Sequence, residues 1–171
     1  MIKNIIKKIL KEELDLTKPV VVFVGGRDDS KYKPIEEQTG ILKSGLGNNF
    51  TVIPHRYTEV KAAKESIIRN PNCYVVLFSA GCSKSNSIAS LVTDKSKMYI
   101  VDPYSCDSNT KDNVINSGVN KNNILGTTNS DNCTGNNVAG TKRNCKAMGF
   151  KSTLKCHWDG LRIVGEIISS R

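Results

Sequence analysis

The stretch that decides the fold runs from Asn72 to Ser83 and reads NCYVVLFSAGCS. The five residues from Tyr74 to Phe78 form a short apolar run, which predicts a buried β-strand. The run ends at Ser79, and two small residues then lead into a helix-compatible segment from residue 82 to about residue 92. A strand, a serine, a sharp turn and a helix form the layout of a nucleophile elbow, in which the helix N-terminus directs its free N–H groups toward the serine oxygen.

The elbow pattern is Gly-x-Ser-x-Gly, and this chain contains only part of it. Leu77 stands where the first glycine is expected, whereas Gly81 supplies the second. Small residues are needed beside the serine because the turn is tight. The alternative interpretation of Ser79 is an N-cap serine that opens an ordinary helix.

Composition limits the classes of protein that fit the chain. Its 171 residues, 38% of them hydrophobic, predict one globular domain. The net charge of +9 favours acidic partners or surfaces, but no basic run, zinc-finger spacing or aromatic-basic motif indicates nucleic acid. The six cysteines include no Cys-x-x-Cys pair, so we expect no metal site and no cofactor. The start of the chain is not a secretory signal, because lysines interrupt its apolar part, and this predicts a reduced, cytoplasmic protein.

Residues 1–18 are predicted to form an amphipathic helix that precedes the main domain at residues 19–171. Its apolar residues recur at helical spacing, with lysines between them: Ile2, Ile5, Ile6, Ile9, Leu10 and Leu14. We expect this helix to pack on the domain. Docking on a membrane surface through its basic charge, or on a partner, is the alternative.

Strands and helices alternate along the rest of the chain. Strands are predicted at 20–24, 50–54, 74–78, 98–101 and 123–125, and helices at about 34–46, 59–69, 82–92, 110–117 and 161–169. Thr110 is predicted to cap the helix at 110–117, and Gly118 to end it. Asp159 is predicted to cap the last helix, at 161–169. This alternation predicts an α/β fold: a three-layer sandwich around a mainly parallel five-stranded sheet.

Two glycines follow the most apolar predicted strand, Val20 to Val24. Gly25 and Gly26 would lie at the carboxyl edge of the sheet, where open α/β sheets bind their ligands. Neither Gly-x-Gly-x-x-Gly nor a Walker pattern is present, although a flavodoxin-like phosphate or nucleotide binder stays a further hypothesis. The better fit is an oxyanion-hole loop, which together with Ala80 would direct backbone N–H groups toward the serine.

Three kinds of side chain complete the candidate site. Ser79, an aspartate after the fourth or fifth strand, and His157 before the last helix would meet at one sheet edge. Serine would attack an acyl carbonyl, histidine would transfer its proton, and the aspartate would orient the histidine. Asp102 is preferred as the acid because a strand end fixes its position, and Asp131 is the alternative.

These residues carry a resemblance to a known family. The chain from Pro19 to Arg171 resembles the α/β-hydrolase superfamily, in a minimal form similar to cutinases and small lipase-like esterases. The similarity rests on Val20–Gly26 as the oxyanion strand and loop, Phe78–Gly81 as the elbow, and Cys156–Trp158 before the last helix. It implies a serine esterase that acts on a small ester or lipid-like substrate. A binding or structural protein that keeps this fold without catalysis is the alternative.

Overall fold

The structure, a computed structural model, describes residues 2–3, 17–29, 32–103, 108–127, 152–154 and 157–171. Its strands are β1 (Val20–Val24), β2 (Thr51–His55), β3 (Tyr74–Phe78), β4 (Met98–Val101), β5 (Ile124–Thr127) and β6 (Ser152–Leu154). Its α-helices are α2 (Ile35–Leu46), α3 (Val60–Arg69), α4 (Ser85–Ala89), α5 (Ser108–Asn116) and α7 (Asp159–Ser169). Three 3₁₀ turns connect them: η1 (Ser79–Lys84), η2 (Lys95–Lys97) and η3 (Lys121–Asn123). Most of the predicted helix at 1–18 lies outside the described residues.

The sheet is parallel throughout and has the order β2-β1-β3-β4-β5-β6. Its first five strands confirm the predicted α/β fold with a five-stranded sheet, and β6 adds a short pairing to the edge strand β5. The central strands β1, β3 and β4 are almost fully buried, which explains their continuous apolar runs.

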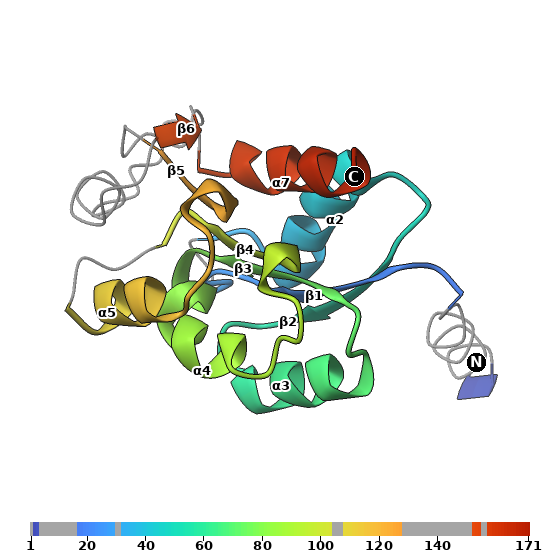
Figure 1. Cartoon of the computed structure of the whole chain (residues 1–171). Helices are drawn as coiled ribbons and strands as arrows, with labels where there is room; N and C mark the ends of the chain where they lie inside the picture. The colour runs from blue at the N-terminus through green and yellow to red at the C-terminus, as the bar shows by residue number, and fades with distance from the viewer. Residues whose placement is uncertain (1, 4–16, 30–31, 104–107, 128–151, 155–156) are drawn as a thin grey trace.

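Helices cover both faces of the sheet, so the molecule has three layers (Figure 1). Helices α2 and α7 lie on one face, and α3, α4 and α5 lie on the other. Alternate residues of each strand point to opposite faces, and two separate apolar clusters result. In β3, for example, Val75 and Leu77 face α3 and α4, whereas Val76 and Phe78 face α2 and α7.

Helices α2 and α7 pack unusually close to one another because glycines stand at their contact. A Cβ on Gly45 would lie 2.0 Å from the carbonyl oxygen of Arg162, and one on Gly165 would lie 2.6 Å from that of Leu42. Any larger side chain would therefore push the two helices apart. This contact fixes the position of α7, which begins two residues after His157.

Three local predictions were wrong. The segment after Ser79 is a 3₁₀ turn before the short helix α4, because its small serine-rich residues have low α-helix propensity. Helix α5 begins at Ser108, so Thr110 lies inside it and is not its cap. Asp159 is the first residue of α7 rather than its cap, and its carboxylate accepts hydrogen bonds from Arg162 at 3.0 Å.

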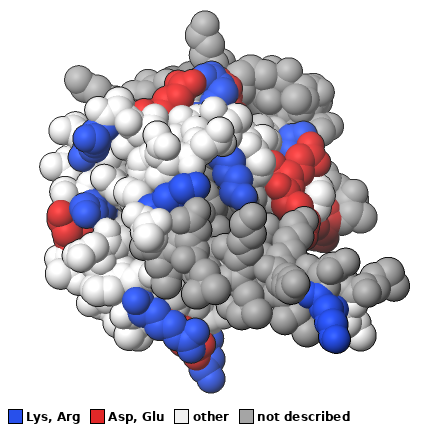
Figure 2. Space-filling view, turned by 90° about the vertical axis from the view of Figure 1, so that its right-hand side faces the viewer, with Lys and Arg blue, Asp and Glu red and all other residues white. Residues whose placement is uncertain are grey.

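Two further features concern the charges on the surface and the length and apolar character of the helices. On the face shown in Figure 2, basic side chains stand in several separate places with acidic ones between them. No helix within the described ranges combines the length and apolar character that crossing a membrane requires.

Candidate active site

The candidate site lies at the carboxyl edge of the sheet. Ser79 directly follows β3, Asp102 directly follows β4, and His157 stands two residues before α7. Because these strands are parallel neighbours, their carboxyl ends lie side by side. All three side chains belong to buried residues, with exposed fractions of 5%, 0% and 3%.

Ser79 has a backbone conformation that side-chain-bearing residues rarely adopt. Its φ of 52° lies in the left-handed region, where an L-residue has an unfavourable contact between its Cβ and the carbonyl group. The turn is tight because Gly81 presses on the end of β1: a Cβ at that position would lie 2.6 Å from the carbonyl oxygens of Val24 and Gly25. Strained residues of this kind gather at functional sites.

Asp102 and His157 form a buried pair. The Oδ2 atom of Asp102 lies 2.5 Å from Nδ1 of His157. An ionised carboxylate only accepts hydrogen bonds, so this contact suits a histidine whose Nδ1 carries the hydrogen, and in the neutral ring that leaves the lone pair on Nε2. Asp102 also has a positive φ of 47°, and its backbone N–H donates to the carbonyl oxygen of Leu125 at 2.7 Å. This bond ties the residue that follows β4 to the neighbouring strand β5.

Aromatic contacts hold the imidazole next to the strand that carries the serine. The His157 ring lies 4.6 Å from the Phe78 ring and 4.9 Å from the Trp158 ring, centroid to centroid. Phe78 immediately precedes Ser79 in the chain. No hydrogen bond joins the Ser79 hydroxyl to His157 in the described part of the structure, and hydrogen bonds of this type often tighten only when substrate binds.

The glycine loop after β1 touches the serine. A Cβ on Gly26 would lie 2.8 Å from Cβ of Ser79 and 3.3 Å from its Oγ. The N–H of Gly25 donates to the carbonyl oxygen of His55 at 2.9 Å, and the N–H of Gly26 donates to Oε1 of Gln38 at 2.9 Å. Both of these donors are thus already bonded within the protein.

The N–H of Ala80 differs from these two donors. Ala80 follows Ser79 within the first turn of η1, where N–H groups have no partner inside the helix. Of the three residues predicted to bind an oxyanion, it is therefore the one whose donor fits that task best. The oxyanion hole itself stays a prediction.

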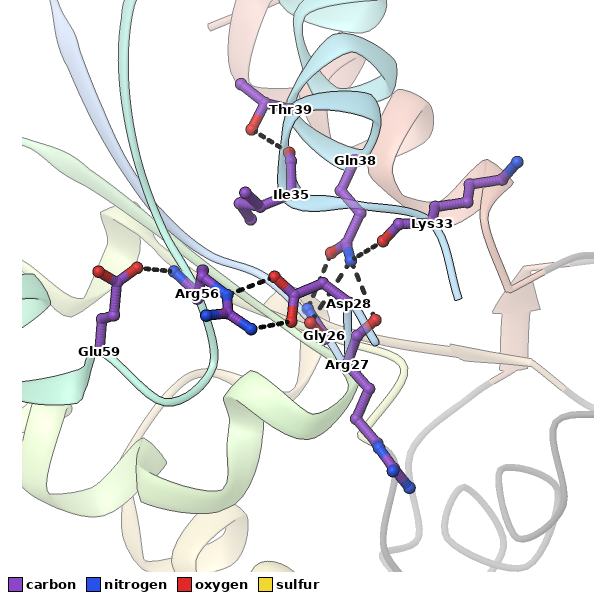
Figure 3. Close-up of polar contacts among 9 residues, drawn as sticks. All are labelled: Gly26, Arg27, Asp28, Lys33, Ile35, Gln38, Thr39, Arg56 and Glu59. Atoms are coloured by element: carbon purple, nitrogen blue, oxygen red, sulfur yellow. Dashed lines mark hydrogen bonds and ion pairs between the residues drawn. The ribbon is translucent and has the colours of Figure 1, made fainter. Parts of the chain in front are cut away.

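Gln38 is the residue of this region that sequence analysis missed. It is fully buried and binds the backbone of the glycine loop (Figure 3). A signal was present in the sequence, because Gln38 shares the helical spacing of Ile35, Leu42 and Leu46 and so occupies an inward-facing position. A polar residue at such a position must find hydrogen-bond partners inside the protein.

Other candidate residues are either placed elsewhere or not described. Asp131 and Cys156 lie outside the described residues. His55 ends β2 and binds the Ser66 hydroxyl at 2.8 Å, and burial lowers its pKa. Cys82, behind the elbow, is completely buried, and burial raises its pKa well above the usual range, which keeps this thiol unreactive.

A pocket of about 250 Å³ lies at the opposite edge of the sheet, between the start of β1 and the start of β3. Its lining includes Lys18, Arg69 and Cys73. It is separate from the candidate site. Among the described residues, no three His, Cys, Asp or Glu side chains gather as they would around a metal ion.

Comparison with known proteins adds no family to these observations. No family model matches the chain, and no curated protein or solved structure gives a significant match. The function must therefore be argued from the site itself.

Proposed function

We propose that the protein is a serine hydrolase that cleaves an acyl ester through Ser79, His157 and Asp102. The observation that carries this proposal is the buried Asp102–His157 pair, which lies against Phe78 at the sheet edge where the strained Ser79 stands. A nucleophile, a base and a group that orients the base are the three parts that covalent acyl transfer requires. Small esters or lipid-like esters are the expected substrates.

Each side chain would have a defined task. His157 Nε2 would take the proton from Ser79 Oγ as that oxygen attacks the carbonyl carbon, and would then return it to the departing alcohol. Asp102 would keep the proton on Nδ1 and stabilise the imidazolium that forms. Water, activated by the same histidine, would then release the acid from the acyl-enzyme. The Ala80 N–H would stabilise the oxyanion of both tetrahedral intermediates.

Two observations favour the alternative, a non-catalytic protein with this fold. The Ser79 hydroxyl and His157 are not hydrogen bonded in the described structure, and the N–H groups of Gly25 and Gly26 are bonded elsewhere. A hydrolase must therefore bring Nε2 and Oγ together on binding substrate, whereas a binding protein has no need to do so.

Labelling with a fluorophosphonate probe separates the two functions, because the probe modifies serines that a nearby base activates. The wild type should be labelled, and Ser79→Ala and His157→Ala should each abolish labelling. Ser87→Ala is the matched control and should be labelled normally. It removes a serine hydroxyl of α4 whose exposed hydrogen bond goes to the Lys84 carbonyl oxygen. A folded wild type that resists both the probe and turnover of a short-chain chromogenic ester would contradict the hydrolase proposal.

A further inference from the structure

The inner part of the loop between β1 and α2 is held by one buried side chain, that of Gln38. Gln38 stands in the first turn of α2 with no exposed surface, and its amide faces the loop (Figure 3). Its Oε1 accepts the N–H of Gly26 at 2.9 Å. Its Nε2 lies 2.8 Å from the carbonyl oxygen of Lys33, 3.2 Å from that of Arg27 and 3.4 Å from that of Gly26. One amide therefore connects the beginning of the loop with its end.

These contacts matter most at Gly26, because this residue touches both Gln38 and the serine. The N–H and the carbonyl oxygen of Gly26 both face the Gln38 amide, while the open side of its Cα faces Ser79. Gly25 is equally confined, since a Cβ there would lie 2.7 Å from Gln38 Oε1. The orientation of the two peptide groups next to the serine is thus set by Gln38.

A second anchor holds the outer part of the same loop. Asp28 accepts two hydrogen bonds from Arg56, at 2.6 Å and 3.0 Å (Figure 3). The Asp28 side chain is 5% exposed, whereas that of Arg56 is 51% exposed. This ion pair ties the loop to the segment after β2, and in the described structure neither of its side chains is hydrogen bonded to Gly26 or Ser79. Gln38, which binds Gly26, is therefore the anchor that can control the geometry at the nucleophile.

We propose that Gln38 is a positioning residue that holds the Gly26 backbone against Ser79 in the arrangement needed for acyl transfer. This inference rests on the proposed hydrolase function. A positioning defect should slow the chemical step more than it weakens binding, because displacement of a catalytic element by even 1 Å can reduce rates about 10²-fold.

The test compares rates of fluorophosphonate labelling over a range of probe concentrations. Gln38→Met keeps the length of the side chain but removes all of its hydrogen bonds to the loop. We expect its maximal labelling rate to fall at least tenfold, with the half-saturating probe concentration changed less than threefold. Thr39→Val is the matched control, because it removes a partly buried hydrogen bond to the Ile35 carbonyl oxygen in the same helix and none to the loop. It should stay within twofold of the wild-type rate.

Gln38→Glu provides a second variant if the methionine variant does not fold. An ionised glutamate places an oxygen where Nε2 faces three carbonyl groups, whereas the protonated acid can donate a hydrogen bond again. The ratio of the variant rate to the wild-type rate should therefore rise as the pH falls. A folded Gln38 variant that is labelled at the wild-type rate, with no such pH-dependent ratio, overturns the inference alone. An unlabelled wild type overturns it together with the proposed function.

Discussion

Four residues of the described chain have a left-handed backbone, and they divide into two kinds. Gly47 and Gly118 follow helices α2 and α5, where the chain only has to change direction. Ser79 and Asp102 follow the neighbouring strands β3 and β4 and also have a positive φ, although both carry side chains. For a residue with a Cβ this conformation costs about 1–2 kcal/mol, which glycine avoids. Under the proposed function, the two strand ends would retain this strain because their side chains take part in catalysis.

Replacing Ser79 by glycine gives the largest expected contrast between function and stability. Ser79→Gly should abolish probe labelling, since the nucleophile is gone. Its free energy of unfolding should stay within about 1 kcal/mol of the wild-type value, because the relief of backbone strain offsets the greater flexibility of glycine. Urea unfolding and labelling of the same sample measure the two effects. Persistent labelling, or a loss of several kcal/mol, would contradict the comparison.

The second prediction concerns the other strained strand end. Asparagine tolerates the left-handed conformation and fills nearly the same space, so Asp102→Asn should fold normally. Its amide lacks the negative charge and permits the wrong histidine tautomer, so we expect hydrolysis of a chromogenic ester to slow by about 10³- to 10⁴-fold. Asp94→Asn, at an exposed aspartate that binds Ser96, serves as the control. Similar rates for Asp102→Asn and the wild type would remove the aspartate from the proposed mechanism.

The central strands were predictable because they are short, apolar and almost fully buried. Three predicted strands, at 20–24, 74–78 and 98–101, match β1, β3 and β4 residue for residue. Parallel strands place their carboxyl ends at one edge, and this geometric rule alone put Ser79 and Asp102 near each other. Predictions at helix ends failed more often, since caps depend on local hydrogen bonds that compete with several alternatives.

Contacts between side chains distant in sequence were harder to predict. Asp102 was the preferred one of two candidate acids because a strand end fixes its position, but its 2.5 Å contact with His157 becomes visible only in the structure. The hydrogen bonds of Gln38 depend on where the loop after β1 folds back on α2, and no sequence period encodes that path. Which N–H groups of Gly25 and Gly26 are already bonded likewise becomes visible only in three dimensions.

The third prediction concerns Gly47 and Gly118, the two residues of positive φ that follow helices. Gly118→Ala and Gly47→Ala should each lower the free energy of unfolding by about 1–2 kcal/mol, because alanine is strained at their φ values of 72° and 75°. Labelling by the probe should remain within twofold of the wild-type rate. Gly40→Ala is the control, since Gly40 lies within α2 with no heavy atom near its added Cβ, and it should be neutral or stabilising. A large loss of labelling in Gly118→Ala or Gly47→Ala would erase the distinction between the two kinds of position.

The smallest expected effect concerns His55, at a strand end without backbone strain. Burial lowers the pKa of His55, although the nearby Glu59 opposes this shift. The unfolded chain therefore binds a proton more readily than the folded protein does, so the stabilising contribution is present above about pH 6.5 and is lost as the pH falls through the folded-state pKa. His55→Gln should consequently lose less stability than the wild type between pH 7.5 and pH 5, as measured by urea unfolding. Equal losses would show that His55 has the same proton affinity in both states. Because His55 binds Ser66 rather than the Asp102–His157 pair, labelling of this variant at pH 7.5 should match the wild type.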